Sequence, residues 1–133
     1  MTTRPLRILL VEDNRLNQEL VRDLLEAAGH DVQVATDGHS MRAHLAADGA
    51  PDIILLDVLL PGGVDGVELL GELRSGRFAA LPIIAVTAQA LPGDLERFVA
   101  AGFDAVVTKP IDTRSFVGAV ERQASRRRAA AAP

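Results

Sequence analysis

Two adjacent carboxylates end the first apolar run of the chain, in the sequence RILLVEDN at positions 7–14. Glu12 and Asp13 repel each other, and burying either carboxylate is costly unless a positive charge compensates. A third carboxylate, Asp57, follows the apolar run IILL, and Lys109 follows the run AVVT. If these groups met, the acids would outnumber the lysine, and a hard divalent cation would balance the charge. Mg²⁺ suits such a site because it prefers oxygen ligands and needs only one or two protein carboxylates.

Five short apolar runs predict the strands that carry these residues. The first, third and fourth are continuous rather than alternating, which is typical of strands covered on both faces. Segments with helical spacing separate the runs, and crossovers of about 10–20 residues favour parallel strands with right-handed connections. We therefore predict a doubly wound α/β fold, a five-stranded parallel sheet with five helices on its two faces. The predicted strands are Arg7–Val11, Asp31–Ala35, Asp52–Leu56, Ile83–Val86 and Ala105–Thr108.

Apolar side chains at helical spacing predict the helices and the face that each turns to the core. Gly29 is expected to end the first helix, and either Asp112 or Thr113 is expected to cap the last one. The expected core-facing sets are Leu16, Leu20, Leu24 and Ala28; Met41, Leu45 and Ala46; Val67, Leu70 and Leu73; Leu95, Phe98 and Val99; and Phe116, Val117 and Val120.

Reactive side chains stand at the ends of the predicted strands, where ligands bind in a doubly wound fold. Glu12 and Asp13 follow the first strand and Asp57 the third, while Thr87 follows the fourth and Lys109 the fifth. Taken singly, each has an ordinary interpretation as a solvated loop acid, a helix cap or a surface charge. Because all of them fall at one edge of the predicted sheet, we interpret them together as one site.

The ordered motifs VEDN, LLD, VTA and TKP resemble the receiver domain of two-component response regulators, over about residues 7–125. The resemblance implies the flavodoxin-like receiver fold, with Asp57 as the residue that accepts a phosphoryl group. It also implies that Asp13, Asp57 and the backbone carbonyl of Leu59 bind Mg²⁺ directly. Glu12 matches the acid that holds the metal through water.

Two further residues match the family's contacts to the phosphoryl oxygens, namely Thr87 and Lys109, and Pro110 matches a proline that follows a cis peptide bond. Phosphoryl transfer needs an in-line nucleophile and neutralisation of charge on the equatorial oxygens. Asp57 would form a mixed anhydride, Mg²⁺ and Lys109 would neutralise charge, and Thr87 would donate a hydrogen bond. Such a protein is not a conventional enzyme, although it catalyses its own Mg²⁺-dependent phosphorylation and dephosphorylation.

The implied phosphoryl donor is a phosphohistidine on a histidine kinase or a histidine phosphotransfer protein. The stretch VEDNRLNQ resembles receivers of phosphorelays, and Ala85–Ile111 resembles single-domain regulators of the cell-cycle type. The 133-residue chain ends 23 residues after Pro110, so we expect no DNA-binding output domain. We expect the signal to leave by protein contact, through helix four, strand five and helix five, or by onward transfer of the phosphoryl group.

Two features depart from the family's pattern. The loop after Asp57 reads DVLLPGGVDG, and its double glycine adds one residue to the usual DxxMPxMDG. Val106 stands where many receivers carry tyrosine or phenylalanine, so an aromatic rotamer switch cannot operate through that position. The positions that tune hydrolysis in the family hold Leu59 and Gln89, and we expect Gln89 to orient any attacking water.

Composition sets the remaining limits. With 48% apolar and 24% charged residues, the chain is typical of one globular domain. We place a receiver domain at 1–125 and a frayed or disordered tail at 126–133, whose three arginines are interpreted as a solvated helix end. The absence of cysteine excludes disulfides, the net charge of −4 disfavours direct nucleic-acid binding, and no apolar run could cross a bilayer. We expect a cytoplasmic protein whose histidines, His30, His39 and His44, lie at the surface without metal spacing.

Three other classes were weighed against this interpretation. A flavodoxin-like cofactor binder would need a phosphate-cradling loop and aromatic rings, yet the chain has charged residues after its first strand and no Trp or Tyr. An aspartate-based phosphatase usually carries a second acid two residues after its nucleophile, where this chain has Leu59. A receiver-like binding module that acts without phosphorylation remains the alternative, although such modules normally lack one of the key residues.

Overall fold

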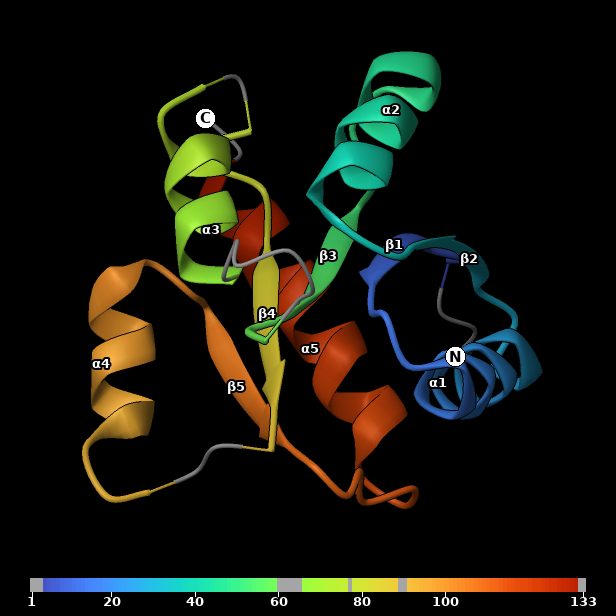
Figure 1. Cartoon of the computed structure of the whole chain (residues 1–133). Coiled ribbons are helices and arrows are strands. Elements are labelled where there is room, and N and C mark those ends of the chain that lie inside the picture. The colour runs from blue at the N-terminus through green and yellow to red at the C-terminus, as the bar shows by residue number, and fades with distance from the viewer. Residues whose placement is uncertain (1–3, 60–65, 77, 89–90, 132–133) are drawn as a thin grey trace.

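The computed structural model describes residues 4–59, 66–76, 78–88 and 91–131, with side chains through Ser125. Its centre is a five-stranded parallel sheet in the order β2-β1-β3-β4-β5 (Figure 1). This order confirms the doubly wound α/β fold that the alternation of strands and helices predicted. The strands are β1 (Arg7–Val11), β2 (Asp31–Ala35), β3 (Ile53–Asp57), β4 (Ile83–Thr87) and β5 (Ala105–Thr108).

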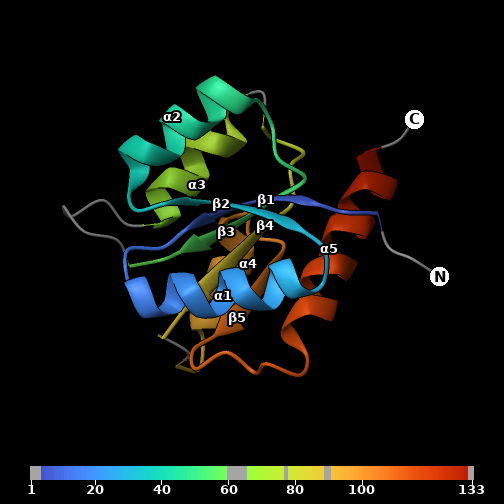
Figure 2. The same cartoon turned by 90° about the vertical axis from the view of Figure 1, so that its right-hand side faces the viewer.

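Helices cover both faces of the sheet, and Figure 2 shows α1 on one side with α2 and α3 on the other. One core cluster joins α2, α3 and α4 to the sheet through residues that include Met41, Leu70 and Phe98. The other joins α1 and α5 to the opposite face, with Leu25 and Val120 among its members. The helices are α1 (Arg15–Ala27), α2 (Gly38–Asp48), α3 (Gly66–Arg74), α4 (Asp94–Ala101) and α5 (Phe116–Ala131).

The register of the central strands brings their carboxyl ends to one edge. Val11 pairs with Leu56, and Asp57, one residue further along, pairs with Val86. Strands β1, β3 and β4 are buried on nearly every residue, as their continuous apolar runs predicted. β3 begins and ends one residue later than predicted, so Asp57 is its last residue rather than the first residue after it.

The predicted core-facing row of α1 is wrong. Leu16 is 75% exposed and Leu20 is 37% exposed, whereas Val21 and Leu25 are buried against the sheet. Val21 and Leu25 each follow a leucine of the predicted row by one position, which is about 100° around a helix of 3.6 residues per turn. The buried face is therefore turned away from Leu16 and Leu20, while Leu24, at its edge, is half-buried against the same core cluster.

Helix α4 also buries less than its apolar spacing predicted. Only Phe98 of the predicted set is buried, in an edge-to-face contact with Phe103 at 6.2 Å between ring centroids. Leu95 is 45% exposed and Val99 is 55% exposed. The helix packs against α3 and the edge strand β5, so a single row of its side chains reaches the core.

Asp112 forms the turn that leads into α5. Its carboxylate accepts a hydrogen bond from the Arg114 N–H at 3.0 Å, and its backbone carbonyl accepts one from the Phe116 N–H at 3.1 Å. The helix begins at Phe116, so the cap predicted at Asp112 or Thr113 stays a prediction. The helix continues to Ala131, past the predicted boundary at residue 125, while the fraying expected for 126–133 stays a prediction. No helix in the described part of the chain is long and apolar enough to cross a membrane.

His30 is buried, which contradicts the prediction that it lies at the surface. Its side chain is 1% exposed, and its Nδ1 accepts a hydrogen bond from the Leu6 N–H at 3.0 Å. Because Nδ1 is an acceptor, the ring proton lies on Nε2, which donates to the Glu121 carboxylate at 2.7 Å. This contact ties the loop between α1 and β2 to α5. The partner lies 91 residues away in the chain, so no local pattern could reveal it.

Replacing His30 by alanine should therefore lower the stability of the fold. The change leaves the Leu6 N–H buried without its acceptor, and such a group costs about 2–3 kcal/mol. Urea unfolding of His30→Ala at neutral pH measures the loss. His39→Ala, at an exposed position of α2, serves as the control and should change the free energy of unfolding by less than about 0.5 kcal/mol. Equal stabilities of the two variants would show that the His30 contacts do not stabilise the protein.

Candidate functional site

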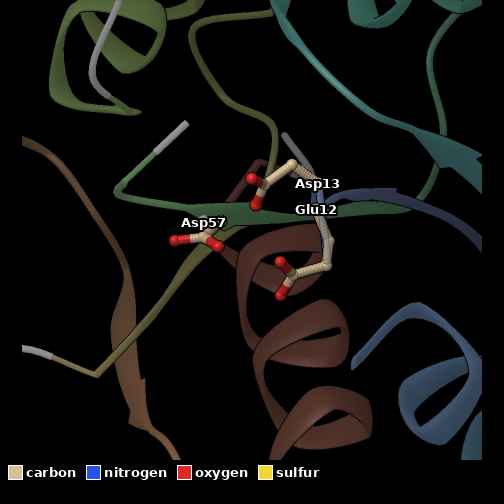
Figure 3. Close-up of side chains that lie close together, drawn as sticks. All are labelled: Glu12, Asp13 and Asp57. Atoms are coloured by element: carbon tan, nitrogen blue, oxygen red, sulfur yellow. The ribbon is translucent and has the colours of Figure 1, made fainter. Parts of the chain in front are cut away.

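Three carboxylates gather at the carboxyl edge of the sheet. Glu12, Asp13 and Asp57 offer ligand oxygens that all lie within 4.8 Å of one another (Figure 3). The first two leave the end of β1 and the third ends β3, so the neighbouring strands bring them together. Glu12 is 1% exposed and Asp57 is 4% exposed, whereas Asp13 is open to solvent. The expected meeting of these three acids is confirmed.

The Lys109 ammonium pairs with both buried acids. Its Nζ lies 2.9 Å from Glu12 Oε1 and 3.0 Å from Asp57 Oδ2. The backbone of Lys109 is held at the sheet edge because its N–H donates to the carbonyl of Thr87 at 2.8 Å. The peptide bond between Lys109 and Pro110 is cis, as the family resemblance implied. Lys109 thus supplies the positive charge that the paired acids of the sequence require.

Burial and hydrogen bonding shift the pKa values of Glu12 and Lys109 in opposite directions. Burial raises the pKa of Glu12 above its usual value, although hydrogen bonds from Lys109 and Asn14 lower it in part. Burial alone would lower the pKa of Lys109, but its hydrogen bonds to Glu12 and Asp57 raise the pKa above the usual value. The ammonium therefore stays charged throughout the neutral range. Burial thus makes the charged form of Glu12 costly, and the Lys109 ammonium offsets part of that cost.

The acceptor carboxylate is fixed by two donors on different elements. Asp57 Oδ1 accepts a hydrogen bond from the Leu59 N–H at 2.9 Å, and Oδ2 accepts one from Lys109 at 3.0 Å. Thr87 is the last residue of β4 and is fully buried beside β3 and β5. The hydrogen bond from its N–H holds the backbone of Leu59 next to the Asp57 carboxylate. The role of the Leu59 carbonyl as a metal ligand stays a prediction.

One residue that positions the acceptor was missed by sequence reasoning. Gly66, the first residue of α3, has no room for a side chain, because a Cβ there would lie 2.5 Å from the Asp57 carbonyl oxygen and 2.8 Å from the Val58 Cα. Its N–H donates to the Val58 carbonyl at 2.7 Å. The signal that could have found it is the DG pair at the end of the loop after Asp57. Glycine at this point lets α3 pack directly on the end of β3.

The departures from the family pattern are only partly within the described structure. Val106 lies on β5, half-buried and packed against the core beneath α3 and α4. The double glycine at 62–63 and Gln89 fall outside the described residues, so their predicted roles are not tested. Leu59 is described, and its side chain is 50% exposed beside the acceptor.

The residues present fit a hard divalent cation. Three carboxylates face one ammonium, so two formal negative charges are left over at the sheet edge. The donors are oxygens, and the exposed Asp13 leaves the cluster open on one side, both of which suit Mg²⁺ with its retained waters. The buried Asp57 carboxylate beside the Lys109 ammonium also provides a nucleophile with a cationic partner for a charged phosphoryl group.

Comparison with known proteins gives the same picture. The family model of the response regulator receiver domain matches residues 8–121. The polar-differentiation response regulator DivK of Brucella anthropi is 38% identical over 118 residues, which cover 88% of this chain and 94% of that protein. DivK of Brucella ovis is also 38% identical, over 115 residues that cover 86% of this chain and 92% of that protein.

Solved structures show the same fold. The receiver domain of the sensor histidine kinase PA1611 from Pseudomonas aeruginosa, solved with a magnesium ion in its active site cleft, is 34% identical with a TM-score of 0.78. The match covers 92% of this chain and 99% of that one. A response regulator from Chloroflexus aurantiacus gives a TM-score of 0.84 at 28% identity, over 92% and 99% of the two chains. With the motifs, the fold and the carboxylate site in agreement, the chain belongs to the response regulator receiver domain family.

Proposed function

We propose that this receiver takes a phosphoryl group on Asp57 from a phosphohistidine, with Mg²⁺ bound by Asp13, Asp57 and the Leu59 carbonyl and held through water by Glu12. The observation that carries the proposal is the contact of Lys109 with both Glu12 and Asp57 beside the exposed Asp13. This arrangement holds a nucleophile and two formal negative charges in excess at one edge of the sheet. The alternative, a binding module that is never phosphorylated, would have no use for that assembly.

The transfer step follows from the positions of the side chains. A carboxylate oxygen of Asp57 attacks the phosphorus in line, the P–N bond to the donor histidine breaks, and its electron pair stays on the imidazole nitrogen. The product is a mixed anhydride on Asp57. Bound Mg²⁺ would supply neutralisation of charge on the phosphoryl oxygens. Lys109 would pair with one of those oxygens, and the Thr87 hydroxyl would donate to another.

The proposed partners follow from the same chemistry. The donor is a histidine kinase or a histidine phosphotransfer protein, and we place the receiver with it in the cytoplasm. For the outgoing signal we propose the surface of α4, β5 and α5. Support comes from exposed apolar side chains on α4 and three residues before its start, where Leu91, Leu95 and Val99 are 71%, 45% and 55% exposed. Onward transfer of the phosphoryl group to a second phosphotransfer protein is the other route.

Asp57 should be the single site of phosphorylation. After incubation with acetyl phosphate and Mg²⁺, intact-mass spectrometry should show one added phosphoryl group on the wild-type protein and none on Asp57→Asn. Asp23→Asn, an exposed aspartate on α1, is the matched control and should be labelled like the wild type. Labelling of Asp57→Asn would refute Asp57 as the acceptor.

Asp13 should contribute more than Glu12 to Mg²⁺ affinity. Both Glu12 oxygens already have partners, because Oε1 contacts Lys109 at 2.9 Å and Oε2 accepts from the Asn14 N–H at 3.1 Å. Asp13 is the exposed carboxylate and is proposed as a direct ligand. Glu12→Gln should therefore weaken binding about tenfold, and Asp13→Asn should weaken it more.

The measurement is a Mg²⁺ titration followed by calorimetry or NMR, because the chain has no tryptophan to report binding by fluorescence. Both variants are compared with the wild-type protein at one pH and ionic strength. Equal losses in Asp13→Asn and Glu12→Gln would mean that the two acids hold the metal in the same way, contrary to the proposed division between direct and water-mediated contact.

A further inference from the structure

We propose that Gln18 of α1 is a positioning residue for the metal site, because its side-chain amide fixes the peptide between Glu12 and Asp13 and so directs the Asp13 carboxylate. The Gln18 Nε2 donates a hydrogen bond to the Glu12 carbonyl at 2.7 Å. The inference rests on the Mg²⁺ site of the proposed function and adds a residue that touches neither the metal nor the phosphoryl group.

The bond acts on Asp13 through the geometry of the backbone. The Glu12 carbonyl and the Asp13 N–H belong to one planar peptide unit. A donor that holds this carbonyl therefore fixes the plane from which the Asp13 Cα and Cβ project. Gln18 is half-buried, so water competes less for the carbonyl than it would at an exposed contact.

Gln18 forms hydrogen bonds to the residues on both sides of Asp13. Its side chain holds the Glu12 carbonyl at 2.7 Å, and its backbone N–H donates to the Asn14 carbonyl at 2.9 Å. The Glu12 N–H is bonded in turn to the Ala35 carbonyl on β2 at 2.9 Å. Asp13 itself is exposed, so the fixed neighbours set where its carboxylate can reach.

Capping of α1 does not explain this contact. Asn14 already caps the helix, since its side-chain oxygen accepts from the Asn17 N–H at 3.0 Å. A glutamine in the first turns of a helix ordinarily extends into solvent, whereas Gln18 turns back to a carbonyl six residues earlier. Mg²⁺ demands near-ideal octahedral geometry, so a ligand loop held in place gains affinity that a freely moving loop would lose.

The test uses Gln18→Met, which keeps the length and helix propensity of the side chain but removes the donor. Its Mg²⁺ affinity, measured by calorimetry on the full chain, should fall about tenfold, the smaller loss typical of outer-shell partners of a metal. Phosphorylation by acetyl phosphate should need more Mg²⁺ yet reach the wild-type rate at saturation. In metal-free protein the NMR signal of the Asp13 amide should shift, because that N–H shares the peptide whose carbonyl lost its donor.

The control is Gln123→Met, the same substitution within α5, where the residue is half-buried. It should leave both the Mg²⁺ affinity and the Asp13 amide signal unchanged. If Gln18→Met folds poorly by thermal unfolding, Gln18→Leu repeats the test with another good helix former that lacks a donor.

The outcomes separate this inference from the proposed function. A Mg²⁺ affinity of Gln18→Met equal to that of the wild type, or an equal loss in Gln123→Met, overturns the role of Gln18. Such a result would leave the proposed metal site unaffected if Asp13→Asn still weakened binding more than Glu12→Gln. A wild-type protein that binds no Mg²⁺ would instead contradict the proposed function itself.

Discussion

One ammonium group shared by two buried carboxylates is the interaction on which the rest of this structure depends. Glu12 and Asp57 would each be costly to bury alone, and Lys109 meets both, at 2.9 and 3.0 Å. These residues come from the ends of β1, β3 and β5, which are far apart in the chain. The parallel sheet brings those ends to one edge, and the single lysine leaves Asp13 uncompensated there. That imbalance is the basis of the proposed metal site.

The surface proposed for the outgoing signal has few buried side chains. Helix α4 is anchored by Phe98, while Leu95 and Val99 on the same helix stay exposed. The helix is preceded by Gly93 and followed by Gly102, both with positive φ angles that favour glycine. Val106 on the neighbouring strand has few rotamers to choose between. These features support the proposal that a change at Thr87 reaches partners through the position of the helix, since Val106 offers no aromatic ring to rotate.

Sequence patterns predicted the strands, which of them are buried on both faces, and the five residues proposed for the site. Each of these features can be read from a short stretch of sequence. Continuous apolar runs identify buried strands, and the acids, Thr87 and Lys109 follow directly from where the runs end. Contacts between distant segments were predictable only where the order of strands implies them. The His30 pairing with Glu121 joins residues 91 positions apart, and the fit of Gly66 against Asp57 depends on how α3 packs on β3. The row predicted for α1 failed because the leucine pattern gave no sign that Val21 and Leu25, each one position after a predicted leucine, face the sheet.

Mg²⁺ is proposed to bind here because the carboxylates outnumber the ammonium that pairs with them. The most direct measurement compares Mg²⁺ affinity of the wild-type protein with that of Lys109→Met by calorimetry. Lys109→Met removes a positive charge within contact distance of Glu12 and Asp57. Its loss should strengthen Mg²⁺ binding by roughly tenfold, since water and salt screen much of the repulsion between the ammonium and the metal ion. Unchanged or weaker binding in a folded Lys109→Met variant would contradict this explanation, because surplus negative charge would then not be what binds the metal.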